Sequence, residues 1–238
     1  MKLDILVFAA HPDDAELSCS GTIASHIALG KKVGIIDLTR GELGTRGSAE
    51  IRDQEAAESA KVLQLSTRLN LRMADGFFAY NRENQIKIVE QVRRFQPEMV
   101  FLNAVEDRHP DHAKGARLQS DAVFLSGLRK IETTWEGSAQ EAWRPKQVFH
   151  YIQDYYIKPD VIVDVSDHWE TKMNSIKAFK SQFYDPNSKE PESPISSKEF
   201  INNLEGRALQ MGRLIGAKYG EGFTTPRTIG VDNLFDLK

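Results

Sequence analysis

Two tetrapeptides of matching type hold the residues of this chain that could do chemistry. They are His11-Pro12-Asp13-Asp14 and His109-Pro110-Asp111-His112. Together they offer three imidazoles and three carboxylates, which are groups that bind divalent metals and transfer protons. Three protein ligands and an open position for water form the usual catalytic zinc site, in which the pKa of the bound water falls to about 7. The pair therefore indicates a zinc hydrolase site with a carboxylate left over to act as a base.

The spacing within the tetrapeptides suggests which side chains bind the metal. His11 and Asp14 lie three residues apart at a predicted strand-to-helix turn, and Pro12 favours the first turn of a helix. These two residues would supply two ligands, and His112 would supply the third. Asp13 could then face the zinc-bound water and take its proton. From the residues alone, Asp13 and Asp14 could exchange these roles.

The second tetrapeptide also offers groups that could stabilise negative charge. A protonated His109 would stabilise an oxyanion or protonate a leaving amine, and Asp111 would hold the tautomer of that histidine. Asp107 or Arg108 could line the mouth of the same site. His-Pro-Asp can also be simple turn chemistry, in which the aspartate caps a helix. Two such turns, each after a strand of one sheet, favour the catalytic site.

Alternating apolar strands and amphipathic helices must position these groups. The apolar runs Ile5 to Ala10 and Val33 to Leu38 predict strands that are buried on both faces. Further strands are expected at residues 67–71, 99–103, 147–151 and 161–165. Helices are expected at residues 15–29, 48–65, 84–95, 113–128, 166–179 and 200–219, with Ser48 and Ser166 as N-caps. This order predicts an α/β fold with a mostly parallel sheet, in a single domain over residues 1–238.

Both tetrapeptides follow strands, and ligands of such sheets bind beyond the carboxyl ends of the strands. The two motifs are therefore expected to meet at one edge of the sheet. The pattern Gly41-x-x-Gly44-x-x-Gly47 is neither a P-loop nor the dinucleotide fingerprint, so it does not indicate a nucleotide. The segment Asp185 to Ser197 contains three prolines and is expected to be a loop and a candidate substrate lid.

Composition excludes several other classes of protein. The 238 residues include 31 Lys and Arg against 34 Asp and Glu, so there is no basic excess that would indicate a nucleic-acid partner. Cys19 is the single cysteine, which excludes an intrachain disulfide and a cysteine-rich zinc site and suggests a reduced, cytoplasmic setting. The short N-terminal apolar run contains Asp4, and we expect neither a signal peptide nor a membrane span.

At the two tetrapeptides the chain resembles the LmbE/PIG-L family of zinc-dependent N-acetylglucosaminyl deacetylases. The first element of that family, (A/P)-H-P-D-D after a strand, is present at residues 10–14, and the second, H-P-D-H, at residues 109–112. The loop 37–47 also resembles the family. Residues 177–183 and 219–223 resemble the branch that makes bacillithiol. The resemblance therefore covers nearly the whole chain.

This resemblance implies a Rossmann-like three-layer fold and assigns the roles that spacing left open. It implies one zinc per chain, with ferrous iron as the other candidate in vivo. The implied ligands are His11, Asp14 and His112. Asp13 would be the general base, His109 the acid or oxyanion stabiliser, and Asp111 its partner.

The reaction implied by the resemblance removes acetyl from N-acetylglucosaminyl malate. The group attached to the sugar stays open, because malate, inositol or another aglycone would be distinguished by residues at the rim. A homo-oligomer is also implied, often a hexamer of two trimers. The competing hypotheses are a non-catalytic metal- or sugar-binding module and a phosphoesterase, and the latter usually needs two metals.

Four residues outside the tetrapeptides are candidates for a role near the site. Arg52 matches an arginine that faces the active site in the family and could bind a carboxylate bidentately, although an ion pair within its own helix is the common alternative. Glu42 and Arg46 could contact sugar hydroxyls or malate, or could be solvated. His150 could reach the mouth of the site, but a hydrogen-bonded core histidine is the more frequent case.

Overall fold

The apolar runs of the sequence form a central sheet in the computed structural model, which describes residues 1–237. The strands lie in the order β3 (Thr67–Asn70), β2 (Val33–Asp37), β1 (Ile5–Ala9), β4 (Met99–Leu102), β7 (Gln147–Tyr151), β9 (Gly220–Thr224) and β8 (Val161–Asp164). Neighbouring strands are parallel, except that β9 runs antiparallel to β7 and β8. The predicted α/β fold with a mostly parallel sheet is confirmed.

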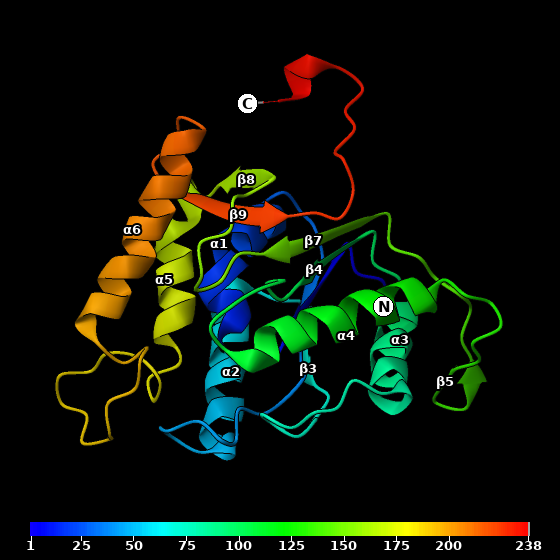
Figure 1. Cartoon of the computed structure of the whole chain (residues 1–238), viewed down its shortest axis with the longest axis horizontal. Coiled ribbons are helices and arrows are strands. Elements are labelled where there is room, and N and C mark those ends of the chain that lie inside the picture. The colour runs from blue at the N-terminus through cyan, green and yellow to red at the C-terminus, as the bar shows by residue number, and fades with distance from the viewer. Residues whose placement is uncertain (238) are drawn as a thin grey trace.

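Helices cover both faces of this sheet (Figure 1). On one face lie α3 (Arg82–Phe95) and α4 (Pro110–Ser126), and on the other lie α1 (Asp14–Ala28), α2 (Ala49–Leu63), α5 (Trp169–Lys177) and α6 (Lys198–Leu214). The remaining elements are the hairpin of β5 (Thr134–Trp135) and β6 (Ser138–Ala139) and the 3-10 turns η1 (Ser166–His168) and η2 (Leu234–Asp236). None of the described helices is both long and apolar enough to cross a membrane.

The side chains of β1 point alternately to the two faces of the sheet, and they pack into two cores, one on each face. Phe8 packs with Ile88 of α3, whereas Val7 packs with Ile23 of α1 and Leu63 of α2. All of these side chains are buried. Because β1 is buried on both faces and lies next to β4, the turns that follow these two strands are held at one edge of the sheet.

The helices lie where the sequence patterns predict them, but α4 starts at Pro110 instead of residue 113, and further differences lie near the C-terminus. Ser48 caps α2 as predicted, but Ser166 caps no helix, because it lies in η1 and its hydroxyl donates to Asp164. The helix predicted at residues 200–219 ends at Leu214, and Gly216 then adopts a φ of 70°, which reverses the chain. Residues 220–224 form β9, a strand that its glycines hid from the sequence pattern.

Candidate metal and catalytic site

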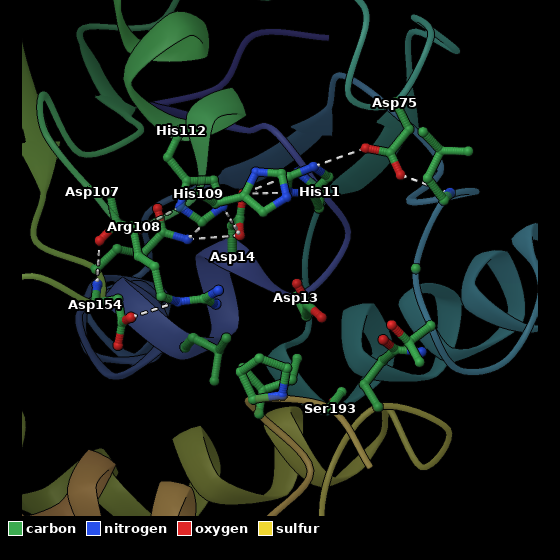
Figure 2. A pocket seen from close by; sticks show the side chains of 18 of the residues that line it. His11, Asp13, Asp14, Asp75, Asp107, Arg108, His109, His112, Asp154 and Ser193 are labelled. Carbon is green, nitrogen blue, oxygen red and sulfur yellow. Dashed lines mark hydrogen bonds and ion pairs between the residues drawn. The ribbon is translucent and has the colours of Figure 1, made fainter. Parts of the chain in front are cut away.

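The turn after β1 buries three of the predicted site residues. The backbone N–H of His11 donates to Asp14 Oδ2 at 3.0 Å, and the backbone N–H of Asp14 donates to the His11 carbonyl at 3.3 Å. Between them, Asp13 has a φ of 111°, in the left-handed region that few residues other than glycine adopt. Figure 2 shows the Asp13 carboxylate apart from Asp14, in the open part of the cavity. The side chains of Asp13 and Asp14 therefore point in different directions from the turn.

His11 and His112, two of the predicted metal ligands, both lie close to the third, Asp14. His112, in the first turn of α4, places its Nε2 3.2 Å from Asp14 Oδ1, and His11 Nδ1 lies 3.6 Å from Asp14 Oδ2. In a tetrahedral zinc site with Zn–N and Zn–O bonds of about 2 Å, neighbouring ligand atoms lie about 3.3 Å apart. The donor types and their spacing thus fit a divalent metal.

Each ligand imidazole meets a carboxylate at its other nitrogen. His11 Nε2 lies 3.0 Å from Asp75 Oδ1 and 3.3 Å from Asp111 Oδ2, and His112 Nδ1 is bonded to Asp107. Such carboxylates orient metal-binding histidines and make them more basic. Burial lowers the pKa of both imidazoles, but the neighbouring carboxylates outweigh it, so the pKa of His11 lies well above its usual value and that of His112 is about 9. The carboxylates around the two imidazoles give this part of the site a negative charge, which also favours the binding of a cation.

Among the described residues, two groups of side chains have ligand atoms close enough together to hold a metal. The first is His11, His109 and His112, and the second is His11, Asp75 and Asp111. The other contacts of the second group argue against a metal there. Asp111 Oδ2 accepts a hydrogen bond from the backbone N–H of Gly76 at 2.8 Å, and Oδ1 lies 2.6 Å from Lys114 Nζ. An ammonium group at this distance would repel a divalent cation. We therefore propose that the metal binds to the three predicted ligands, with the second group as their support.

His109 lies beside the ligands, with its ring centroid 4.7 Å from that of His11 and 5.0 Å from that of His112. Its Nδ1 accepts a hydrogen bond from the backbone N–H of Asp111 at 3.2 Å, so the proton of the neutral ring sits on Nε2. Burial and the two neighbouring histidines lower the pKa of His109. These observations favour a neutral N–H donor over a protonated acid. The prediction that the Asp111 carboxylate orients His109 is wrong, because that carboxylate contacts His11 instead.

Arg52 of α2 is paired with Asp13 rather than with a carboxylate of its own helix. Its Nη2 lies 2.8 Å from Asp13 Oδ2, and both side chains are buried. Burial raises the pKa of Asp13, Arg52 lowers it and Asp14 raises it, with a net value of about 7 that suits a general base. Gly41, at a φ of 65°, covers the guanidinium so closely that a Cβ there would lie 2.6 Å from Arg52 Nη1. Arg52 also lines the cavity, and its contact with a substrate stays a prediction.

The structure does not support the predicted substrate contacts of Glu42 and Arg46. Glu42 accepts a hydrogen bond from the backbone N–H of Asp75 at 2.9 Å. Arg46 is buried and donates to Phe183 and Ser188. Neither side chain is among those that line the cavity. Both instead tie the glycine-rich loop to neighbouring segments, Glu42 to Asp75 and Arg46 to Phe183 and Ser188.

Two amides and a carboxylate support the ligands although they were not predicted from the sequence. Gln153 Nε2 donates to Asp14 Oδ1 at 2.7 Å, and Asn103 Nδ2 donates to Asp14 Oδ2 at 3.1 Å. Asn103 and Asp75 follow β4 and β3, so a polar residue after a strand was the signal that could have revealed them. His150 is a buried core histidine, bonded through Nδ1 to the Asn103 carbonyl at 2.7 Å.

A cavity of about 460 Å³ opens over this cluster. Its lining includes the apolar side chains of Phe77 and Leu204. It also includes two arginines, Arg108 and Arg207. Residues 193–195, from the predicted loop 185–197, complete the lining (Figure 2). The movement of this loop as a lid stays a prediction. The site is thus a pocket with a polar floor and a volume suited to a small molecule.

Comparisons with known proteins identify the family. The family model PIG-L, described as GlcNAc-PI de-N-acetylase, matches residues 6–123, which include both tetrapeptides. The uncharacterized deacetylase YaiS of Escherichia coli is 31% identical over 158 residues, which span 64% of this chain and 83% of that protein. The chain belongs to the PIG-L family. The resemblance seen in the tetrapeptides is confirmed at this level, and the bacillithiol branch stays a prediction.

Further relatives of this PIG-L chain match over most of its length. Diacetylchitobiose deacetylase of Thermococcus kodakarensis is 28% identical over 229 residues, which span 92% of this chain and 81% of that enzyme. The crystal structure of the conserved protein TT1542 from Thermus thermophilus superposes with a TM-score of 0.85 and 35% identity, covering 97% of this chain and 98% of that one. The likeness therefore extends to the whole fold that carries the site.

Proposed function

We propose that this PIG-L protein is a metal-dependent N-deacetylase that hydrolyses the acetamido group of an N-acetylglucosaminide. The observation that carries the proposal is the placement of Asp13 and His109 in one cavity with His11, Asp14 and His112, the three proposed ligands. A base and a hydrogen-bond donor next to a metal are what amide hydrolysis requires. The family description and the deacetylase from Thermococcus kodakarensis support an N-acetylated sugar as the substrate class.

The side chains have distinct parts in this chemistry. His11, Asp14 and His112 would hold a divalent metal, zinc or ferrous iron, which when bound supplies a Lewis acid and lowers the pKa of water. Asp13 accepts the proton of the water that attacks the acetyl carbonyl. His109 Nε2–H donates a hydrogen bond to the carbonyl oxygen as negative charge develops on it. Asp13 then returns the proton to the nitrogen as the C–N bond breaks, giving acetate and a free amine.

We further propose that the sugar carries an acidic aglycone, and malate is the one that the resemblance to the bacillithiol branch suggests. Support comes from Arg108 and Arg207, which share the single carboxylate of Asp154. Arg108 Nε donates to Asp154 at 2.9 Å, whereas Arg207 Nη2 lies 3.7 Å from it, too far for a hydrogen bond. The guanidinium of Arg207 can therefore bind a substrate carboxylate in a bidentate manner.

Arg207→Met is expected to weaken the use of acidic conjugates selectively. KM for N-acetylglucosaminyl malate should rise about 10- to 100-fold, because a hydrogen bond to a charged group contributes about 1.5–3 kcal/mol. Acetate release would be measured on a panel that includes this conjugate, its inositol counterpart and a neutral methyl glycoside. Arg213→Met, an exposed change on the same helix, serves as the control. An equal loss on acidic and neutral members would contradict the acidic aglycone, and no acetate from any member would contradict the deacetylase.

A further inference from the structure

The helix that carries Asp14 is broken shortly after its first turn. Cys19 has φ of −140° and ψ of 15°, outside the helical range, so two helical segments are joined at this residue to make α1. The first segment holds Asp14 at its start and is little more than one turn long. A helical segment this short is not stable by itself in water. Its position must therefore be set by contacts with the rest of the fold.

A buried ion pair stands in the break. In a regular helix the Gly21 N–H would donate to the Leu17 carbonyl. Here Leu17 O accepts from Lys172 Nζ at 2.9 Å, and the Gly21 N–H donates to Glu221 Oε1 at 3.0 Å. Lys172 Nζ and Glu221 Oε1 lie 2.7 Å apart. The two charged groups thus form a bridge between backbone groups that a continuous helix would join directly.

The cation of the pair caps the carboxyl end of the first helical segment, and the anion caps the amino end of the second. Lys172 Nζ also donates to the Glu16 carbonyl at 3.0 Å, at the carboxyl end of the first segment. Glu221 Oε2 accepts from the backbone N–H and the hydroxyl of Thr22, both at 2.6 Å, at the amino end of the second segment. A cation at a helix carboxyl end and an anion at an amino end both complement the helix dipole. The side chains are only 4% and 3% exposed, so water cannot replace these bonds.

The two halves of the pair come from elements that are distant in the sequence. Lys172 lies on α5 and Glu221 on β9, and both elements pack against α1. The fit is close, because a Cβ on Gly21 would lie 2.8 Å from Val165 Cβ and 3.0 Å from Glu221 Oε1. The break in α1 is therefore formed and held by the tertiary fold.

We propose that Lys172 and Glu221 are positioning residues, which set the place of the Asp13–Asp14 turn relative to His112 on α4. Lys172 holds the carboxyl end of the first segment, and the two hydrogen bonds between His11 and Asp14 hold its amino end. Removal of the pair would let this segment shift and would spread the ligand atoms. The catalytic meaning of this inference rests on the proposed function, but its effect on metal binding does not.

Lys172→Met tests the inference, with Arg93→Met as its matched control. Arg93 is likewise a buried cation that donates to backbone carbonyls, those of Ser126, Leu128 and Ile131, but it lies away from the site. Zn²⁺ affinity would be measured by chelator competition and amide hydrogen exchange on a peptide covering residues 11–23. We expect Lys172→Met to weaken Zn²⁺ binding about tenfold or more and to speed that exchange. Arg93→Met should do neither, even where it lowers the Tm by a similar amount.

Equal Zn²⁺ affinities in the two variants, or unchanged exchange in Lys172→Met, would overturn the positioning role. If Lys172→Met does not fold, Glu221→Gln takes its place, because it keeps the shape and one acceptor oxygen. Unchanged Zn²⁺ affinity in a folded Glu221→Gln variant would likewise overturn the inference. A wild-type protein that releases no acetate, but whose Zn²⁺ affinity depends on Lys172, would contradict the proposed function and support the positioning role.

Discussion

Asp13→Asn is expected to lower kcat of the metal-loaded protein by a factor of about 10²–10⁴, the usual contribution of a general base. The amide of asparagine cannot take a proton from the attacking water. It can still accept the hydrogen bond that Arg52 now donates to Asp13 Oδ2 at 2.8 Å, so the turn should keep its shape. Metal content and acetate release would be measured on the same preparation. The metal should remain at the wild-type level while turnover is lost.

The control for this change is Asp53→Asn, at a partly exposed aspartate on α2 that pairs with Arg40. It makes the same chemical change outside the site and should leave turnover unaltered. Full turnover in a metal-loaded Asp13→Asn variant would show that Asp13 is not the base. Loss of the metal from that variant would show that Asp13 and Asp14 have the reverse of the proposed roles.

His112→Ala is expected to abolish both metal retention and acetate release. His112 Nε2 lies 3.2 Å from Asp14 Oδ1, and the imidazole is held by Asp107 at its other nitrogen. Loss of an outer-shell partner typically costs 10–100-fold in metal affinity, about the least that loss of a ligand should cost. Metal per chain after dialysis would be measured by elemental analysis.

His26→Ala controls for the loss of a histidine outside the site. His26 is half-buried on α1 and bonds the Thr22 carbonyl through Nδ1 at 2.8 Å. This variant should retain its metal. If His112→Ala also kept one tightly bound metal, the ligand set would be wrong, and the group of His11, Asp75 and Asp111 would become the better site.

The fold and the meeting of the two tetrapeptides could be predicted because their signals are local, whereas the assignment of the metal ligands stays a prediction. The apolar runs before each tetrapeptide mark β1 and β4, and parallel neighbours bring their carboxyl ends together. His11, Asp14 and His112 therefore meet as the motif spacing indicated. The general position of the site needed only the order of the elements and the direction of the strands.

The partners of these residues could not be predicted, because they depend on contacts between distant segments. Asp111 stands next to His109 in the sequence, but its carboxylate points to His11, about a hundred residues away. Nothing near Arg52 shows that it pairs with Asp13. Local spacing names the groups of a site, whereas the three-dimensional fold decides which of them touch.

The break in α1 shows the same limit for secondary structure. Small and apolar residues from Ala15 to Leu29 predict one continuous helix, and nothing in that segment marks Cys19 as a break. The groups that fill the break, Lys172 and Glu221, come more than 140 residues later. Glu221 also lies in β9, a strand with two glycines among its five residues that the hydrophobic pattern could not reveal.

Acetate release during metal titration tests the central claim most directly. Metal-free protein would be titrated with Zn²⁺ in the presence of an N-acetylglucosaminide, and acetate and free amine would both be measured. We predict release that rises to a plateau at one metal per chain, with acetate and amine in equal amounts. No acetate at any metal content, or a plateau that requires two metals per chain, would contradict a single-metal N-deacetylase built on His11, Asp14 and His112.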